Sequence, residues 1–273
     1  MSARADGTYS NAWRNVSKII LRPLIPMLMK NDWQGRENFP AAGGVIIAPN
    51  HLSYADVLAV ALFCDQAGHR YPVYLAKSTL FNIPVLGFLL RKLGQLPVYR
   101  GQADAALVLR DAEQGIRKGA CVIVYPEGTA TRDPDLWPMV GHTGVARLAL
   151  ATGAPVLPVA HWGAQRILPY GSFRPRLLPR KRVQVIAGPP VDLSAFAGQP
   201  MNSQTLRKAT ELIMADVTAL LGKLREQEPP AEPYHPAVAR RKLRQELRAL
   251  QEQGQPAETQ PHGESAAPGG SSP

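Results

Sequence analysis

The sequence predicts an α/β fold in which a central mixed, largely parallel sheet is flanked by helices. Two observations carry this prediction. Short apolar runs of strand type alternate with longer stretches of helical character from residue 45 to residue 225, which is the pattern of βαβ units. Gly119 and Gly153 stand where two of those helices should end, as glycine commonly does. A length of 273 residues suits one large domain with extensions.

The N-terminal stretch, residues 13–30, predicts an amphipathic helical segment. It mixes aliphatic side chains and Trp13 with four basic residues, and Pro23 and Pro26 interrupt it. A spanning helix needs about 20 mostly uncharged apolar residues, which this stretch does not offer. Two interpretations remain open: an element that lies in a membrane interface, or a surface helix packed on the core.

Strands and helices then alternate along the chain. We expect strands at residues 45–48, 72–76, 95–99, 120–125, 156–161 and 183–187. We expect helices at residues 56–63, 103–118, 144–152 and 202–225. Pro155 and Pro158 bracket the start of the fifth strand, which predicts a fixed turn and a place at the edge of the sheet.

A second apolar stretch, residues 81–90, ends at Arg91 and Lys92. It is too short and too broken to span a bilayer. It could dip into a membrane interface, line a pocket for an acyl chain, or belong to the core.

Charge divides the chain into a basic body and a nearly neutral tail. Residues 1–227 carry 26 Lys and Arg against 15 Asp and Glu, a net charge of +11, whereas residues 228–273 carry a net charge of −1. We therefore expect three parts: a membrane-associating segment at 1–34, the main domain at 35–227, and a tail at 228–273. The tail should comprise a proline-rich linker, a short polar helix and a disordered end.

Composition also limits the partners. A basic surface suits nucleic acid, anionic lipid or phosphorylated small molecules, but the zinc-ligand spacings and aromatic motifs of nucleic-acid binders are missing from the sequence. Cys64 and Cys121 lie far apart and the six histidines are scattered along the sequence. We therefore expect no disulfide framework and no metal site, and we expect the protein to reside in a reducing compartment. No signal peptide is expected, because residues 1–10 are small and polar.

The most informative motif is Asn50-His51-Leu52-Ser53-Tyr54-Ala55-Asp56, directly after the first expected strand. A histidine and an aspartate at this spacing can form a general base and the carboxylate that orients it. No serine nucleophile is needed if the substrate supplies the hydroxyl. The alternative is a capping box, in which Ser53 begins the next helix and Asp56 binds its first N–H groups.

Three further motifs accompany it. Residues 94–100 end in Arg100, whose guanidinium can bind a phosphate. Residues 124–132 include Glu127, Gly128, Thr129 and Arg132, and Gly128 would let a ligand approach the backbone. Residues 153–160 form a proline-bracketed strand that could shape one wall of a pocket. Taken singly, the first of these suits a surface arginine and the second a strand-to-loop turn.

These four motifs, in this order, resemble those of the membrane-associated glycerolipid acyltransferases, especially the 1-acylglycerol-3-phosphate acyltransferases. The resemblance covers residues 11–225, and the first and third motifs are the specific ones. It implies that acyl-CoA or acyl carrier protein donates an acyl group to the free hydroxyl of lysophosphatidic acid, which gives phosphatidic acid.

The resemblance also implies roles for individual residues. His51 would be the general base and Asp56 would orient it. The acceptor would be bound by Arg100, Glu127, Gly128, Thr129 and Arg132, together with Asn50 and Ser53. No metal, cofactor or covalent acyl-enzyme is implied. The enzyme would work at the cytoplasmic side of the cell membrane as a peripheral or monotopic protein, with anionic lipid as a partner.

Departures from the family pattern leave the acceptor open. Ala130 occupies a position where many relatives have arginine, and the nearest arginine is Arg132. The alternatives are therefore an acyltransferase for glycerol-3-phosphate or another lysolipid, a non-catalytic lipid-binding protein of the same fold, and a phosphate-ester hydrolase that uses His51 as base.

Overall fold

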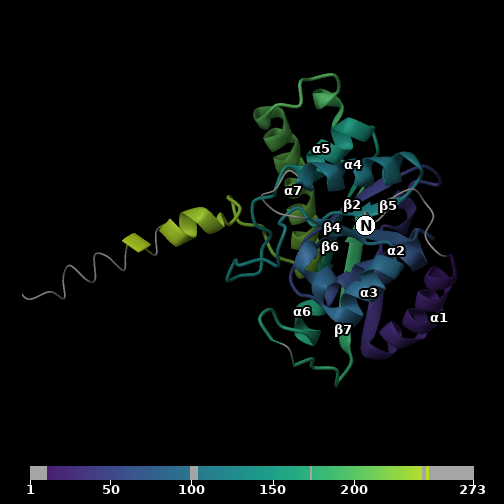
Figure 1. The fold of residues 1–273 in the computed structure, drawn as a ribbon. Coiled ribbons are helices and arrows are strands. Elements are labelled where there is room, and N and C mark those ends of the chain that lie inside the picture. The colour runs from purple at the N-terminus through teal and green to yellow at the C-terminus, as the bar shows by residue number, and fades with distance from the viewer. Residues whose placement is uncertain (1–10, 99–103, 173, 242–243, 246–273) are drawn as a thin grey trace, which may run out of the picture. The chain divides into compact units, whose positions relative to one another are not determined.

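The structure, a computed structural model, describes residues 11–98, 104–172, 174–241 and 244–245 (Figure 1). The chain divides into two compact units, Met1–Tyr234 and His235–Pro273. The first unit contains all the helices and strands described below.

Seven strands form one sheet in the order β1-β7-β6-β2-β5-β3-β4. They are β1 (Met29–Gln34), β2 (Val45–Pro49), β3 (Pro72–Lys77), β4 (Leu96–Val98), β5 (Cys121–Ile123), β6 (Val156–Trp162) and β7 (Lys181–Ala187). β6 and β7 pair antiparallel, and the other neighbouring strands of the described sheet pair parallel. The expected mixed, largely parallel α/β sheet is confirmed.

Helices cover both faces of the sheet (Figure 1). One face is covered by α4 (Asp104–Arg117), α5 (Gly144–Thr152) and α7 (Ser203–Arg225), and the other by α1 (Asn11–Leu28), α2 (Asp56–Ala67) and α6 (Ala164–Ile167). The 3₁₀ turns are η1 (Arg36–Asn38), η2 (Ser78–Asn82) and η3 (Ser194–Phe196), and α3 (Pro84–Lys92) follows η2. Along β2, Ile46 packs with the first set of helices and Ile47 with the second, because successive strand side chains point to opposite faces.

The N-terminal segment contributes more to the sheet than its sequence pattern predicts. Residues 29–34, expected within a membrane-associating segment, form β1 and pair in parallel with β7 from Lys181 onward. The preceding helix α1 continues through Pro23 and Pro26, and its Ile25 is 2% exposed in a cluster with α2 and α6. This part of the chain is therefore built into the main unit.

The expected edge position of the fifth strand is wrong, because β6 lies between β2 and β7. Proline has no backbone N–H group to donate, and Pro158 is tolerated because no such donor is needed at this point of the ladder. Its carbonyl accepts the N–H of Gly188 at 2.9 Å, just beyond the end of β7 at Ala187, where the antiparallel pairing begins with Val159. A central strand can thus hold a proline where its neighbour ends.

Most of the apolar stretch at residues 81–90 lies outside the core, although Phe81 is buried. Val85 is 73% exposed and Phe88 46%. The ring of Phe88 meets that of Trp13 edge to face, with centroids 5.8 Å apart, so α3 and α1 lie side by side. None of the helices in the described residues has the length and apolar character that a membrane span requires.

Candidate active site

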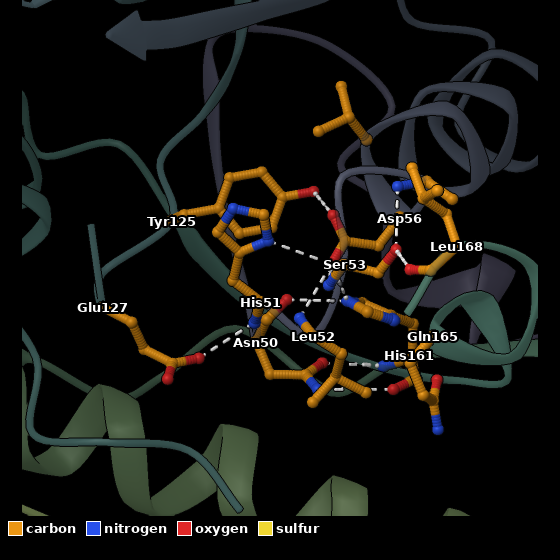
Figure 2. A network of polar contacts seen from close by, with 12 residues as sticks. Asn50, His51, Leu52, Ser53, Asp56, Tyr125, Glu127, His161, Gln165 and Leu168 are labelled. Atoms are coloured by element: carbon orange, nitrogen blue, oxygen red, sulfur yellow. Dashed lines mark hydrogen bonds and ion pairs between the residues drawn. The ribbon is translucent and has the colours of Figure 1, made fainter. Parts of the chain in front are cut away.

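The polar residues of the first and third motifs meet at one edge of the sheet. His51 follows β2, Glu127 follows β5, and His161 lies near the end of β6. These three strands are parallel neighbours, so their carboxyl ends converge at the edge where α/β proteins usually place their ligands. The site is assembled from segments more than 100 residues apart in the sequence (Figure 2).

Asp56 lies at the centre of this network. Its side chain is fully buried, and Oδ2 lies 3.0 Å from Nδ1 of His51. The same oxygen accepts the N–H groups of Leu52 at 2.8 Å and Ser53 at 2.9 Å, and Oδ1 accepts the hydroxyl of Tyr125 at 3.0 Å. The helix does not begin at Ser53, because the N-cap of α2 is Ala55 and no side chain caps it. Asp56 instead binds N–H groups of the turn before α2 and also holds the histidine ring.

His51 is held with one ring nitrogen committed and the other available. Because the carboxylate of Asp56 accepts a hydrogen bond from Nδ1 of His51, the neutral imidazole carries its hydrogen on Nδ1 and has a lone pair on Nε2. Within the described residues Nε2 makes no hydrogen bond. The ring lies against Tyr125, with centroids 4.3 Å apart, and 11% of the side chain is exposed. The arrangement can accept a proton from a group that reaches Nε2.

The electrostatics of the pair suit a base. Burial would lower the pKa of His51, but the charge of Asp56 and the hydrogen bond to it outweigh burial, so the pKa is raised. Burial would raise the pKa of Asp56, but His51 and His161 together hold it well below its ordinary value. Asp56 is therefore an anion at neutral pH, which stabilises the imidazolium that forms when His51 takes a proton.

Both carboxyl oxygens of Glu127 are occupied by the protein's own backbone. Glu127 is 2% exposed, and its two carboxyl oxygens accept the N–H groups of His51 at 2.8 Å and Met139 at 2.9 Å. Burial raises the pKa of Glu127 to about 8, although the two N–H groups partly oppose this. The role that this geometry supports is to hold the backbone of His51 against the loop that contains Met139, rather than to bind an acceptor hydroxyl.

Asn50 and Ser53 are likewise occupied by the protein itself. The amide of Asn50, 0% exposed, accepts the N–H of His161 at 2.9 Å and donates to the His161 carbonyl at 3.3 Å. The hydroxyl of Ser53 donates to the carbonyl of Leu168 at 2.5 Å and accepts the N–H of Ala55 at 3.0 Å. These contacts fix the motif to β6 and to the end of α6 instead of leaving polar groups for substrate.

The rest of the expected acceptor-binding set is only partly brought together. Arg100 lies outside the described residues. Gly128 has a left-handed φ of 68° and its N–H donates to the carbonyl of Tyr125 at 3.0 Å, so glycine is needed for the turn itself. Thr129 is half-buried and Arg132 is exposed. Of these four, Thr129 and Arg132 have side chains that remain available to a ligand.

Two residues that sequence reasoning missed belong to the site. Tyr125 donates to Asp56, and the ring of His161, with 0% exposure, lies 3.3 Å from the same carboxylate. Both are the last residues of strands expected from the sequence, so a rule that polar residues at the ends of neighbouring parallel strands converge would have found them. Within the described residues, no group of three or more His, Cys, Asp and Glu could hold a metal ion.

Comparisons with known proteins agree on one family. A sequence model of the Acyltransferase family matches residues 30–162, which include His51, Asp56, Glu127 and His161. The chain is 32% identical over 148 residues to a chloroplastic 1-acyl-sn-glycerol-3-phosphate acyltransferase of Brassica napus, a match that covers 52% of this chain and 40% of that protein. It is 27% identical over 190 residues to the 1-acyl-sn-glycerol-3-phosphate acyltransferase of Bacillus subtilis, covering 69% of this chain and 87% of that protein.

The fold is similar to that of a solved structure. The crystal structure of the 1-acyl-sn-glycerophosphate acyltransferase of Thermotoga maritima superimposes with a TM-score of 0.60 at 25% identity, over 81% of this chain and 84% of that one. The chain spans less than half the length of the chloroplastic relatives that it matches. Similarity of fold is thus established over most of this chain.

Proposed function

We propose that this chain, which belongs to the glycerolipid acyltransferase family, moves a fatty acyl group from a thioester to the free hydroxyl of 1-acylglycerol-3-phosphate. The thioester would be acyl-CoA or acyl-acyl carrier protein, and the product phosphatidic acid. The observation that carries the proposal is the His51–Asp56 pair, with Nδ1 held 3.0 Å from a buried carboxylate and Nε2 left for the acceptor hydroxyl.

The reaction needs only this pair and correct positioning. His51 Nε2 takes the proton of the acceptor hydroxyl as its oxygen forms a bond to the thioester carbonyl carbon. The tetrahedral intermediate then collapses, the carbon–sulfur bond breaks, and His51 returns the proton to the leaving thiolate. General-base catalysis supplies about 10²–10⁴-fold, and alignment of the two substrates supplies much of the remainder. Neither step requires a covalent acyl-enzyme or a metal ion.

The acceptor's phosphate would be bound by Arg100 and Arg132. Arg132 supports this because it is exposed and lies in the loop after β5, close in sequence to Glu127, which contacts His51. Ala130 replaces the arginine usual in the family, and this favours a second candidate, an acyltransferase that uses glycerol-3-phosphate or another lysolipid. Both candidates share the chemistry of His51 and differ only in the head group that is recognised.

We place the enzyme peripherally on the cytoplasmic surface of a membrane. The support is an apolar face on α1 and α3, on which Ile19 and Val85 are each 73% exposed and Met27 69%. Neither helix contains an acidic residue, and α3 ends in Arg91 and Lys92. Aliphatic side chains beside basic ones favour anionic lipid over neutral lipid.

Vesicle binding tests the membrane proposal. Wild-type protein should co-sediment with vesicles that contain anionic phospholipid more than with zwitterionic ones. The Val85→Ser/Phe88→Ser variant should bind several-fold less, while Leu212→Ser, which removes an exposed aliphatic side chain from α7, should bind as the wild type does. Equal binding by all three proteins would refute a docking role for α1 and α3.

Thiol release from acyl-CoA tests the activity. Purified wild-type protein should release thiol only when lysophosphatidic acid is present, and His51→Ala should abolish the release. His235→Ala, which removes an exposed histidine of the second unit, serves as the matched control and should keep wild-type turnover. A folded His51→Ala protein with normal turnover would refute the proposal.

The same assay separates the alternatives. Release with glycerol-3-phosphate or a phosphate-free lysolipid, but not with lysophosphatidic acid, would assign the second candidate. Release that appears only with acyl-acyl carrier protein would identify the donor. No release with either donor and any acceptor, together with retained lipid binding, would point to a lipid-binding protein, and release of inorganic phosphate would point to a hydrolase.

A further inference from the structure

We infer that His161 is a positioning residue that approaches the same oxygen of Asp56 as His51 does and so sets how strongly His51 holds a proton. The effect of His161 on catalysis rests on the proposed function, but its contact with Asp56 and its effect on the pKa of His51 do not. Nε2 of His161 lies 2.7 Å from the carbonyl oxygen of Asn50 and 3.3 Å from Oδ2 of Asp56. Figure 2 shows the two imidazole rings around the one carboxylate.

The contacts of His161 decide which ring nitrogen carries the hydrogen. Both atoms near Nε2 are acceptors, so Nε2 must be the protonated nitrogen. Nδ1 is buried and has no hydrogen-bond partner among the described residues. A second proton there would leave a charged N–H group buried and unsatisfied, which is costly. His161 is therefore a neutral donor to Asn50 and Asp56.

The backbone around His161 makes its position rigid. β6 and β2 pair as far as Val159 and Pro49, and the side chain of Asn50 then continues the ladder by bonding to both the N–H and the carbonyl of His161. His161 in return donates to the Asn50 carbonyl. This reciprocal bonding fixes β6 to the residue directly before His51.

The second donor changes the electrostatics of the base. Each N–H that points at Asp56 spreads its negative charge and weakens its hold on a proton at His51. Among the described residues, the other titratable groups that face this pair include Tyr125, which donates to Asp56, and Glu127, which accepts the N–H of His51. Tyr54 lies edge to face with the ring of His51, and Tyr74 stacks on Tyr125. Removing the His161 donor should thus raise the pKa of His51, in the direction in which Asp56 already moves it.

Two substitutions separate this electrostatic effect from packing. His161→Leu removes the donor and keeps an apolar side chain in the cavity, whereas His161→Gln can offer an amide N–H near the place of Nε2. Thr210→Val is the matched control, since it removes a buried hydroxyl from α7 that bonds only to the Leu206 carbonyl. If His161 had a purely structural role, the pKa of His51 would be the same in His161→Leu as in Thr210→Val.

The decisive experiment is a titration of ¹⁵N-histidine-labelled full-length protein by NMR, with the His51 signals assigned from His51→Ala. We expect His161→Leu to raise the pKa of His51 by about half a unit or more, and His161→Gln and Thr210→Val to leave it within error. The acid limb of the kcat/KM profile should move by the same amount. An unchanged His51 titration in His161→Leu would overturn the inference.

Two further outcomes keep the test complete. If His161→Leu does not fold, the nitrogen shifts of the wild type decide, because the inference requires a neutral His161 with its hydrogen on Nε2, and a hydrogen on Nδ1 would refute it. If the wild type has no acyl transfer activity but His51 responds to His161→Leu, the proposed function fails while the placement of His161 stands.

Discussion

The segments after β2 and after β5 each bury a carboxyl group, and the two groups differ in charge and in role. Asp56 and Glu127 are 0% and 2% exposed, and each accepts two backbone N–H groups. Asp56 also meets the rings of His51 and His161, which keep it ionised. The hydrogen bonds of Glu127 come from the backbone alone, and burial raises its pKa to about 8.

This difference shows what decides the state of a buried carboxyl group. Backbone donors satisfy its hydrogen bonds but bring no charge, whereas a side chain that can become cationic, as His51 can, favours the anion. Under the proposed function Asp56 would support proton transfer through His51, whereas Glu127 holds the same histidine through its backbone. Two acidic residues that look alike in the motifs thus differ in their charge and in the contacts that they make.

The largest expected effect is at Asp56. Asp56→Asn replaces the anion with an amide that can no longer accept at both oxygens, so the tautomer and the charge that support His51 are lost. We expect kcat to fall by about 10²–10⁴-fold in the thiol-release assay. Asp216→Asn, a half-buried aspartate on α7, is the control that should keep full turnover. Normal turnover in Asp56→Asn would place the base elsewhere.

Glu127 should matter first for stability. Glu127→Ala leaves the N–H groups of His51 and Met139 buried without acceptors, at about 1–3 kcal/mol each, and Glu127→Gln leaves one of them unsatisfied. Chemical unfolding should therefore rank the free energy of unfolding as wild type, then Glu127→Gln, then Glu127→Ala. The KM for the acceptor should change little in Glu127→Gln. A stable Glu127→Gln protein with a sharply raised KM would show instead that Glu127 binds substrate.

The raised pKa of Glu127 predicts a pH dependence of stability. In the unfolded chain the carboxyl group loses its proton near 4.5, but in the folded protein only near 8, so the folded state binds more protons between these values. The free energy of unfolding should fall by on the order of a few kcal/mol as pH rises through this window. His51, whose pKa is also raised, acts with the same sign, so the difference between wild type and Glu127→Gln isolates the Glu127 share. Parallel pH profiles for the two proteins would contradict the prediction.

The smallest effect should come from Arg132, the exposed arginine in the segment after β5. Arg132→Ala should raise the KM for lysophosphatidic acid about 3- to 10-fold, the size of one solvent-exposed ionic contact, with little change in kcat. A phosphate-free lysolipid should show no such change, and Arg207→Ala on α7, also exposed, provides the control. An unchanged KM would remove Arg132 from the acceptor site.

The chemistry-bearing pair was predictable because its members are close in sequence. His51 and Asp56 are five residues apart and separated only by a tight turn into α2, so their contact depends on local geometry. The roles of Asn50, Ser53 and Glu127 were not predictable in this way. Their partners are His161, Leu168 and Met139, respectively, and the family pattern alone suggested that they face a ligand.

By itself, the sequence determined the strands and helices of an α/β sheet and the contact between His51 and Asp56, because apolar periodicity and short-range spacing fix both. Only the tertiary structure decided that Met29–Gln34 completes the sheet beside β7, that β6 is a central strand, and that His161 and Tyr125 reach Asp56. The physical reason is that strand order, and hence which strand ends converge, is set by how whole faces pack against one another. That packing joins residues more than 60 positions apart, and no local pattern records it.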